Sequence, residues 1–294
     1  MRRITLLTNP DKCNLKCPLC FLQQRGHSLD RGEMPLDVAI AAIEKYGDGL
    51  KEVIPSTMGE PLLYSQFDNL LDFCRGKGVR LNLTTNGTFP GKWKTDSGME
   101  LLLCSCSDIK ISALAFEENV NLNKAQWKLN VERLLNCRRM LESQGMRDLS
   151  SVSLQVTLHG KNVSEAAGLL HWAEAVGVHR IKWNPVVFLS VAPPSLVAEY
   201  GLKEGDVEIL RETLTSTKLK CGGSLYFPQN PAGSTADGAA GECPFDGEIW
   251  ILPDGSEQKC PNPERRFGNP DAPAAQCAHC FMKYPERSEY RSRP

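Results

Sequence analysis

Short apolar runs alternate along the chain with longer stretches in which apolar residues recur every three or four positions. Six runs rich in β-branched and other apolar residues predict strands at 3–8, 52–56, 80–85, 108–112, 153–159 and 180–187. The intervening stretches predict amphipathic helices at 35–45, 66–75, 132–144 and 164–175. Strands that alternate with helices form a parallel sheet with right-handed crossovers. The pattern therefore predicts an α/β fold whose ligands bind at the C-terminal ends of the strands.

The pattern changes after the sixth predicted strand. One more helix is expected at about 204–215, before a stretch rich in Gly, Pro, Asn and Ser at 222–241. A compact segment with four of the 12 cysteines follows. This shift divides the chain into a first domain at 1–195, a helix with a linker at 196–241, and a small C-terminal domain at 242–294.

Charge and composition exclude several classes of protein. The 294 residues carry 34 basic and 35 acidic side chains, interspersed, so no charged surface for nucleic acid or for a membrane is expected. The N-terminal apolar stretch is too short for a signal peptide, and no later run is long enough to span a membrane. We therefore expect a cytoplasmic protein, in which 12 cysteines indicate metal binding or chemistry rather than disulfides.

The segment CNLKCPLC places three cysteines within residues 13–20. Cys13, Cys17 and Cys20 have the spacing C-x3-C-x2-C on a loop after the first predicted strand. Such a loop allows three thiolates to bind one iron-sulfur cube and leaves the fourth iron without a protein ligand. The alternatives are a chance spacing and a structural zinc site, which usually takes four ligands; His27 is the only further nitrogen ligand close by.

With Leu19 directly before the third cysteine, this loop resembles that of the radical S-adenosylmethionine (SAM) superfamily. The resemblance implies a partial (β/α)6 barrel, similar to a TIM barrel, and an open iron that binds the amino and carboxylate groups of SAM. In that family an electron from the cluster cleaves SAM to a 5'-deoxyadenosyl radical. MGEP at 58–61 resembles the family's GGEP, so that Gly59 would allow a close backbone approach and Glu60 would meet the methionine ammonium group.

Other predicted strand ends carry polar residues that the resemblance assigns to SAM. Asn86 lies in LTTNG, Ser112 ends DIKIS and would contact the ribose, and Thr157 with His159 lies in LQVTLHG. Each has a structural alternative, because Glu60 could cap the next helix, Asn86 with Gly87 is a common turn pair, and a histidine at a strand end could be solvated. The positions of Glu60, Asn86, Ser112 and Thr157 at consecutive strand ends favour cofactor binding, whereas both interpretations stay open for His159. The resemblance covers about residues 3–190.

The C-terminal segment carries a second cysteine pattern around a predicted β-hairpin. The spacing is C-x16-C-x16-C-x2-C, and it comprises Cys243, Cys260, Cys277 and Cys280. Four thiolates suit zinc and a 4Fe-4S cluster equally well. The hairpin with PDG, the FGN at 267–269 and the closing C-x2-C resemble the shortened SPASM region called a twitch domain, which implies an auxiliary 4Fe-4S cluster with zinc as the alternative.

The remaining cysteines are assigned by their surroundings. Cys74 and Cys137 lie on amphipathic helical patterns and are expected in the core, whereas Cys104 and Cys106 could be core or could approach the barrel. Cys221 opens the glycine-rich linker and is the candidate hydrogen donor to a substrate radical. A fully ligated auxiliary cluster would instead suit oxidation of that radical.

A barrel followed by a twitch domain resembles the aminocyclitol dehydrogenases and the neomycin-type aminoglycoside epimerases of antibiotic biosynthesis. IPSTMGEPLLY and RLNLTTNGTFP are most similar to that group. The resemblance implies an aminoglycoside-like small-molecule substrate, hydrogen abstraction at a carbinol C–H bond, and a flavodoxin or ferredoxin-type reductant. Epimerisation with hydrogen return from Cys221 is the favoured outcome, and oxidation to a ketone is the alternative.

Two further hypotheses and four substrate contacts complete the predictions. A ribosomal-peptide epimerase or maturase is third, because only twelve residues precede Cys13 and no leader-binding domain is expected. An iron-sulfur electron carrier or a zinc-stabilised binding protein is the non-enzymatic class, and a carrier has no use for an open iron. The suggested substrate contacts are Trp183, Asn184, Asp246 and Glu248.

Overall fold

One sheet of nine strands organises the part of the chain that the structure describes. The computed structural model describes residues 2–26, 31–47, 49–56, 58–113, 122–203, 205–206, 224–226, 248–260, 262–277 and 280. The strands are β1 (Arg2–Leu6), β2 (Leu50–Pro55), β3 (Arg80–Thr85), β4 (Cys106–Ser112), β5 (Ser151–Leu158), β6 (Arg180–Pro185), β7 (Ser224–Tyr226), β8 (Ile249–Ile251) and β9 (Glu257–Gln258). Their order is β7-β6-β5-β4-β3-β2-β1-β8-β9, and all neighbours are parallel except β8 and β9. The sheet is open, which confirms the partial barrel predicted from the sequence.

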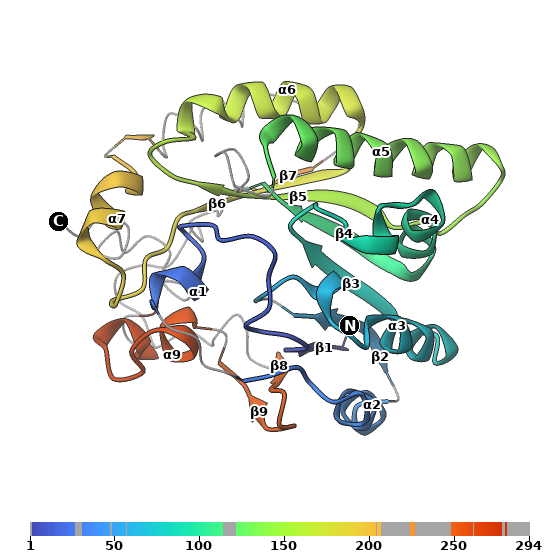
Figure 1. Ribbon diagram of the computed structural model, residues 1–294, viewed down its shortest axis with the longest axis horizontal. Helices are drawn as coiled ribbons and strands as arrows, with labels where there is room; N and C mark the ends of the chain where they lie inside the picture. Colours follow the sequence, from blue (N-terminus) through green and yellow to red (C-terminus); the bar gives the residue numbers. More distant parts are fainter. Residues whose placement is uncertain are drawn as a thin grey trace, which may run out of the picture.

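Helices cover the outer side of this curved sheet, and the loop of residues 9–20 lies on its inner side (Figure 1). The helices are α1 (Phe21–Gln24), α2 (Leu36–Lys45), α3 (Phe67–Gly76), α4 (Asp96–Ser105), α5 (Lys124–Ser143), α6 (Ala166–Val176), α7 (Pro194–Tyr200) and α9 (Pro263–Phe267). Short 3-10 turns are η1 (Pro61–Leu63), η2 (Gly91–Lys94), η3 (Val163–Glu165) and η4 (Pro273–Ala275). None of the helices in the described ranges is long and apolar enough to cross a membrane.

Several elements differ from the sequence prediction, and the short helices α1, α7 and α9 were not expected. Helix α4 was not expected; Thr95 caps it by accepting a hydrogen bond from Gly98 N (3.1 Å). Helix α5 begins earlier than predicted, after Asn123, whose side chain accepts from Gln126 N (2.8 Å). Strand β7 lies within the stretch predicted as a linker and pairs with β6. Most of the helix expected at 204–215 lies outside the described residues.

The two faces of the sheet differ in chemistry. Side chains such as Leu83, Ile111 and Leu154 face the helices and are fully buried, and each contributes about 1.5–3 kcal/mol. Cys74 and Cys137 are buried in this same core, as expected. The inner face of the strands is largely polar. The apolar core therefore lies outside the barrel, and the inner face is left for ligands.

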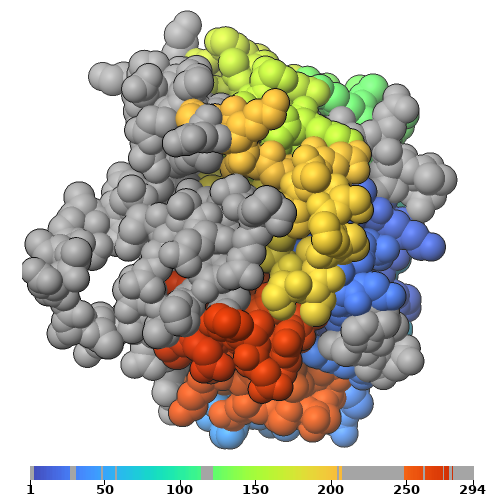
Figure 2. Space-filling model, turned by 90° about the vertical axis from the view of Figure 1, so that its left-hand side faces the viewer, coloured from blue at the N-terminus to red at the C-terminus, as the bar shows by residue number. Residues whose placement is uncertain are grey.

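The C-terminal segment returns to the start of the chain. Ile4 in β1 pairs with Ile249 in β8, and β8 with β9 forms the predicted hairpin. Helix α9 packs on α1, where the rings of Phe21 and Phe267 stack 5.7 Å apart. The Glu264 carboxylate accepts hydrogen bonds from Ser190 N (2.8 Å) and Ser190 Oγ (2.5 Å), so that α9 lies beside the segment that follows β6 (Figure 2).

Candidate functional site

Three thiols line one cavity of about 400 Å³ at the C-terminal ends of the strands. Cys13, Cys17 and Cys20 reach it from the loop between β1 and α1, and Leu19 lines it beside them. The loop is fixed at both ends. Asn9 Nδ2 donates to Glu60 O (2.7 Å) near its start, and the buried Gln24 donates to Leu19 O (2.9 Å) near its end.

The thiols are suited to binding metal as thiolates. Burial raises the pKa of Cys13 and of Cys20, so a metal must displace their protons when it binds. Leu15 N (3.4 Å) and Asn86 Nδ2 (3.7 Å) donate to Cys13 Sγ and would stabilise its charged form. Within the described ranges, no three His, Cys, Asp or Glu side chains form a ready site for a single ion. An iron-sulfur cube binds each thiolate at a separate iron, and therefore fits ligands that are spread around a cavity.

Gly59 lets the β2 end approach the cysteine loop. Its φ is +73°, and an added Cβ would lie 2.2 Å from Asn9 O and 2.6 Å from Lys12 O. Both distances are shorter than any tolerable contact, and the obstacles are backbone atoms. This close contact also allows the next residue to bond to the loop, since Glu60 N donates to Lys12 O (2.8 Å). Only glycine fits here, because any side chain would collide with the backbone oxygens of the loop and because the positive φ is unfavourable for other residues.

The Glu60 carboxyl is the charged group of the cavity wall. It is 1% exposed and accepts hydrogen bonds from Thr85 Oγ1 (2.7 Å), Asn86 N (2.7 Å) and Leu62 N (3.3 Å). Burial nevertheless raises the pKa of Glu60 to about 7. Among the described lining residues Glu60 is the only carboxylate, so a cationic ligand group would find its partner here. The expected cap of the next turn is also present, through the bond from Leu62 N.

Asn86, Ser112 and Thr157 line the same cavity from three neighbouring strand ends. Asn86 is held by Asn14 Oδ1, which accepts from its Nδ2 (2.9 Å), and by donation from Thr88 N to its Oδ1 (2.9 Å). His159 lies elsewhere. Its ring is 1% exposed and packs against Tyr200, so it is neither solvated nor part of the cavity lining.

The four suggested substrate contacts have different outcomes. Asn184 lines the cavity. Trp183 does not, because side chains alternate along β6 and it points into the helix-facing core, where it is fully buried. That prediction is wrong. Glu248 forms an ion pair with Arg3, and Asp246 lies outside the described residues.

Three cysteines of the second pattern lie around α9. Arg266 Nε donates to Cys260 O (2.9 Å), Asn262 Nδ2 to Cys280 Sγ (3.5 Å), and Arg265 to Cys277 Sγ (3.9 Å). Cys243 and Cys221 lie outside the described residues.

Arg266 is an unusual neighbour for these thiols. Its side chain is buried, its guanidinium lies 3.4 Å from the centroid of the Trp250 ring, and its NH2 atom has no hydrogen-bond partner among the residues that the structure describes. Burial lowers the pKa of Arg266 to about 9, and a Cys260 thiolate opposes that shift. A buried cation with a free donor fits an anionic metal-thiolate group in this segment.

Sequence reasoning missed several residues that hold the site together. Thr85 and Asn9 bond to Glu60, and Gln24 and Glu264 join α1 and α9 to the segment after β6. A signal existed for Thr85, since it is the last residue of a strand whose end was already assigned to the site. The other three contacts join segments far apart in sequence and leave no local pattern.

Comparisons with known proteins agree with this architecture. A family model described as the radical SAM superfamily matches residues 10–173. Fe-coproporphyrin III synthase from Methanosarcina barkeri is 23% identical over 197 residues, which are 66% of this chain and 46% of that protein. The tungsten-containing aldehyde ferredoxin oxidoreductase cofactor-modifying protein from Pyrococcus furiosus is 30% identical over 80 residues, which are 26% of this chain and 22% of that protein. The chain thus spans less than half the length of either relative.

Solved structures share the fold at low sequence identity. Streptococcus suis SuiB bound to S-adenosylmethionine is 16% identical with a TM-score of 0.65, covering 95% of this chain and 68% of SuiB. SuiB bound to its precursor peptide SuiA has a TM-score of 0.62 at 16% identity, covering 99% of this chain and 65% of SuiB. Native anSMEcpe with bound AdoMet and the Kp18Cys peptide is 15% identical with a TM-score of 0.59, covering 88% of this chain and 74% of that one.

Proposed function

This chain belongs to the radical SAM superfamily, and from that premise we propose that it removes a hydrogen atom from a C–H bond of a small substrate held beneath the cavity. A 4Fe-4S cluster and SAM supply, when bound, the one-electron chemistry that breaks an unactivated C–H bond. Cys13, Cys17 and Cys20 would hold the cluster. The observation that carries the proposal is that these thiols, Glu60 and the ends of β3 to β6 line a single cavity.

The chain's own residues would position the cosubstrate and exclude water. Glu60 is fixed by three hydrogen bonds before any ligand arrives, and its carboxylate would bind the methionine ammonium group. Asn86, Ser112 and Thr157 would contact the remaining polar groups of SAM. Apolar side chains from the loop and the strand ends, including Phe21 and Met58, would shield the reacting atoms from solvent.

The narrower reaction is epimerisation of an amino sugar or aminocyclitol, with hydrogen return from Cys221, as the sequence resemblance suggests. Oxidation of the same carbinol to a ketone is the alternative outcome. Asp246 and Glu248 were suggested as partners for the substrate ammonium groups; in the structure Glu248 is paired with Arg3. The support for an amino-sugar substrate therefore comes from the sequence motifs.

Modification of a peptide is the second candidate. The support is the shared fold with SuiB and anSMEcpe, both of which have been observed with peptides. An extended peptide would enter the same cavity, and the chemistry at Cys13, Cys17 and Cys20 would be unchanged.

The C-terminal cysteines would hold an auxiliary 4Fe-4S cluster, with zinc as the alternative. The support is the position of Cys260, Cys277 and Cys280 around α9, and the free NH2 donor of Arg266. A flavodoxin or ferredoxin-type protein would supply the electrons. Iron and sulfide analysis separates the metal sites, because two cubes require about eight of each per chain, and one cube with zinc requires about four.

The test is formation of 5'-deoxyadenosine by the reconstituted, reduced protein under anaerobic conditions. The unaltered protein should form it and Cys17→Ala should not. Cys104→Ala is the matched control, because Cys104 is a partly buried cysteine on α4, remote from the cavity lining. Absence of 5'-deoxyadenosine from an unaltered protein with full iron loading would contradict the proposal. If 5'-deoxyadenosine does form, the product is analysed next. Solvent deuterium in the product would favour epimerisation, and a ketone would favour oxidation.

A further inference from the structure

The inward-facing side chains of β3 to β6 form successive layers below the cavity. The layer that lines the cavity consists of Thr84, Ser112, Thr157 and Asn184. Side chains alternate between the two faces of a strand, so the residue two positions earlier faces the same way, about 6.6 Å deeper. The inward-facing residues two positions earlier on the same strands are Asn82, Lys110, Gln155 and Lys182. They do not form one row of the sheet, since Lys110 pairs with Thr84 and Ser153, and Gln155 pairs with Ser112 and Lys182. Lys110 from β4 and Lys182 from β6 thus face the inside of the barrel, on the inner surface (the floor) below the cavity-lining residues Ser112 and Asn184 of the same strands.

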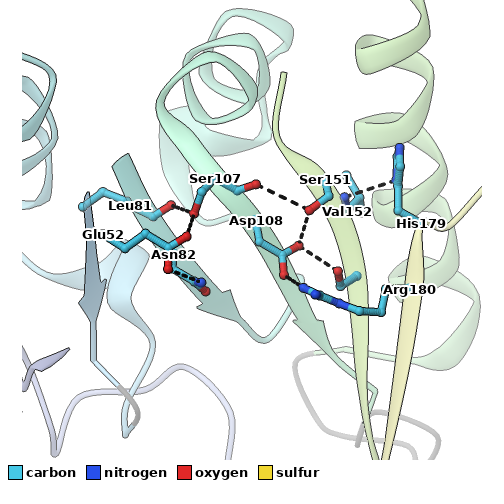
Figure 3. A network of polar contacts seen from close by, with 10 residues as sticks. Glu52, Leu81, Asn82, Ser107, Asp108, Ser151, Val152, His179 and Arg180 are labelled. Atoms are coloured by element: carbon cyan, nitrogen blue, oxygen red, sulfur yellow. Dashed lines mark hydrogen bonds and ion pairs between the residues drawn. The ribbon is translucent and has the colours of Figure 1, made fainter. Parts of the chain in front are cut away.

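The carboxylates around this floor already have partners. Asp108 accepts hydrogen bonds from Ser151 Oγ (2.8 Å) and Ser153 Oγ (2.7 Å) and forms an ion pair with Arg180. The side chains of Asp108, Ser151 and Arg180 point toward one another across neighbouring strands (Figure 3).

Two more carboxylates near the floor are also occupied. Glu52 accepts from Ser107 Oγ (2.5 Å) and Asn82 Nδ2 (3.3 Å), and Glu248 is paired with Arg3. The acidic groups next to the lysines are therefore committed to other donors.

Lys110 and Lys182 are left without such partners. Neither forms an ion pair or a hydrogen bond through its side chain with any residue in the described ranges. Burial lowers the pKa of both lysines; Arg180 and Arg3 lower them further, whereas Asp108 and Glu52 oppose the shift at Lys110 and Glu248 opposes it at Lys182. Lys110 is partly buried and Lys182 is exposed on the inner face of the sheet, so solvent or a ligand supplies the counter-charge that the described carboxylates do not.

We propose that Lys110 and Lys182 form the anion-binding floor of the substrate site, and that the substrate carries an oxyanion, a carboxylate or a phosphate, which they bind. This deepens the proposed hydrogen abstraction and rests on it, but not on the amino-sugar reaction, since the reacting C–H bond would then face the cavity above. Among Arg3, Lys110, Arg180 and Lys182 on one side and Glu52, Asp108 and Glu248 on the other, cations outnumber carboxylates. An oxyanion would accept hydrogen bonds from both ammonium groups and would balance this excess.

The same floor argues against a substrate rich in amines. An unmodified aminoglycoside would place further ammonium groups near two that have no carboxylate partner among the described residues, and like charges at short range repel. A peptide or sugar acid that presents one carboxylate downward would instead be attracted. The inference therefore selects among the substrate classes that the cofactor site alone leaves open.

Calorimetric titration of the reconstituted, SAM-bound protein with two probes, inorganic phosphate and glutarate, tests the proposal. The key variant is Lys110→Met with Lys182→Met, which removes both charges and keeps most of the side-chain volume. Lys110→Arg with Lys182→Arg retains the charges. Lys94→Met is the matched control, because Lys94 is an exposed lysine on η2, outside the barrel. The single Met variants serve if the double variant does not fold.

We expect the unaltered protein to bind at least one probe, and the double Met variant to bind it at least tenfold more weakly. The Arg variant and Lys94→Met should bind within a few-fold of the unaltered protein. A preference for phosphate or for glutarate identifies which oxyanion the substrate carries. Equal binding by the double Met variant overturns the proposal, as does binding of an aminoglycoside in place of both anions. The 5'-deoxyadenosine assay on the unaltered protein separately reports whether the proposed function holds.

Discussion

Replacing Glu60 by glutamine should remove a pH-dependent penalty on folding. The folded protein holds the Glu60 proton more tightly than the unfolded chain does, because burial raises the pKa from 4.5 to about 7. Well below pH 4.5 the carboxyl group is neutral in both the folded and the unfolded protein, and it does not lower the unfolding free energy. As the pH rises from 4.5 through about 7, the unfolded chain releases its proton first, and stability is lost. Above pH 7 the full penalty is present.

The size of this penalty follows from the two pKa values. The difference between 4.5 and about 7 corresponds to about 3 kcal/mol, at about 1.4 kcal/mol for each pKa unit. The glutamine amide would face backbone donors such as Asn86 N, and this lowers the stability of Glu60→Gln by an amount that does not vary with pH. The informative quantity is therefore the difference in unfolding free energy between the two proteins as a function of pH.

Urea unfolding of the iron-free proteins between about pH 4.5 and pH 8 measures that difference. The unaltered protein should lose about 3 kcal/mol relative to Glu60→Gln across this range. Glu33→Gln is the control. Partial burial acts against ionisation of Glu33, but hydrogen bonds from Lys12 and Ser65 hold its pKa below 4.5. The difference in unfolding free energy between the unaltered protein and Glu33→Gln should therefore stay constant above that pH. A difference for Glu60→Gln that does not change with pH would refute the reasoning.

Three further substitutions test other parts of the structure. Gly59→Ala should cost more than about 2 kcal/mol and reduce iron binding, whereas Gly78→Ala, also at positive φ but with open space around it, should cost about 1 kcal/mol; equal losses in urea unfolding would contradict the packing argument. Gln24→Ala removes hydrogen bonds to Leu19 O, Val187 O and Leu189 N, and should lower the unfolding free energy by about 2–3 kcal/mol; a loss below about 0.5 kcal/mol would show that these bonds do not fix α1. Arg266→Met should lower the reduction potential of a second cluster by about 60 mV, the equivalent of one charge-assisted hydrogen bond; an unchanged potential in an electron-paramagnetic-resonance titration would remove Arg266 from that role.

Local pattern was sufficient for the six central strands and for α2, α3, α5 and α6, four of the eight helices in the described residues. Strands of a parallel sheet are covered by helices, so their apolar residues form compact runs, and the range 80–85 matches β3 residue for residue. Helix α4 was missed because its first turn contains Ser97 and Gly98, which weaken the periodicity. Strand β7 has three residues in a glycine-rich stretch, and nothing in such a segment predicts its partner.

The site was predictable where topology alone brings residues together. The motif cysteines, Glu60 and Asn86 converge because parallel strands end at one edge of the barrel. The error at Trp183 was avoidable, because the alternation of Lys182 and Asn184 places the tryptophan on the opposite face. The ion pairs around the barrel floor could not be predicted from the sequence. Whether Lys110 has a partner depends on which carboxylates are already bonded to other strands.

The pairing of β1 with β8 has a consequence for biosynthesis. During translation, β1 emerges first, and the edge that receives β8 stays open until residue 249 has been made. At roughly 5–20 residues per second, that delay lasts roughly ten to fifty seconds. An open edge invites pairing with other nascent chains, and the thiols of the adjoining loop are exposed to oxidants for the same period. The yield of intact protein should therefore depend on chaperones and on iron supply during translation, and not only on the stability of the finished fold.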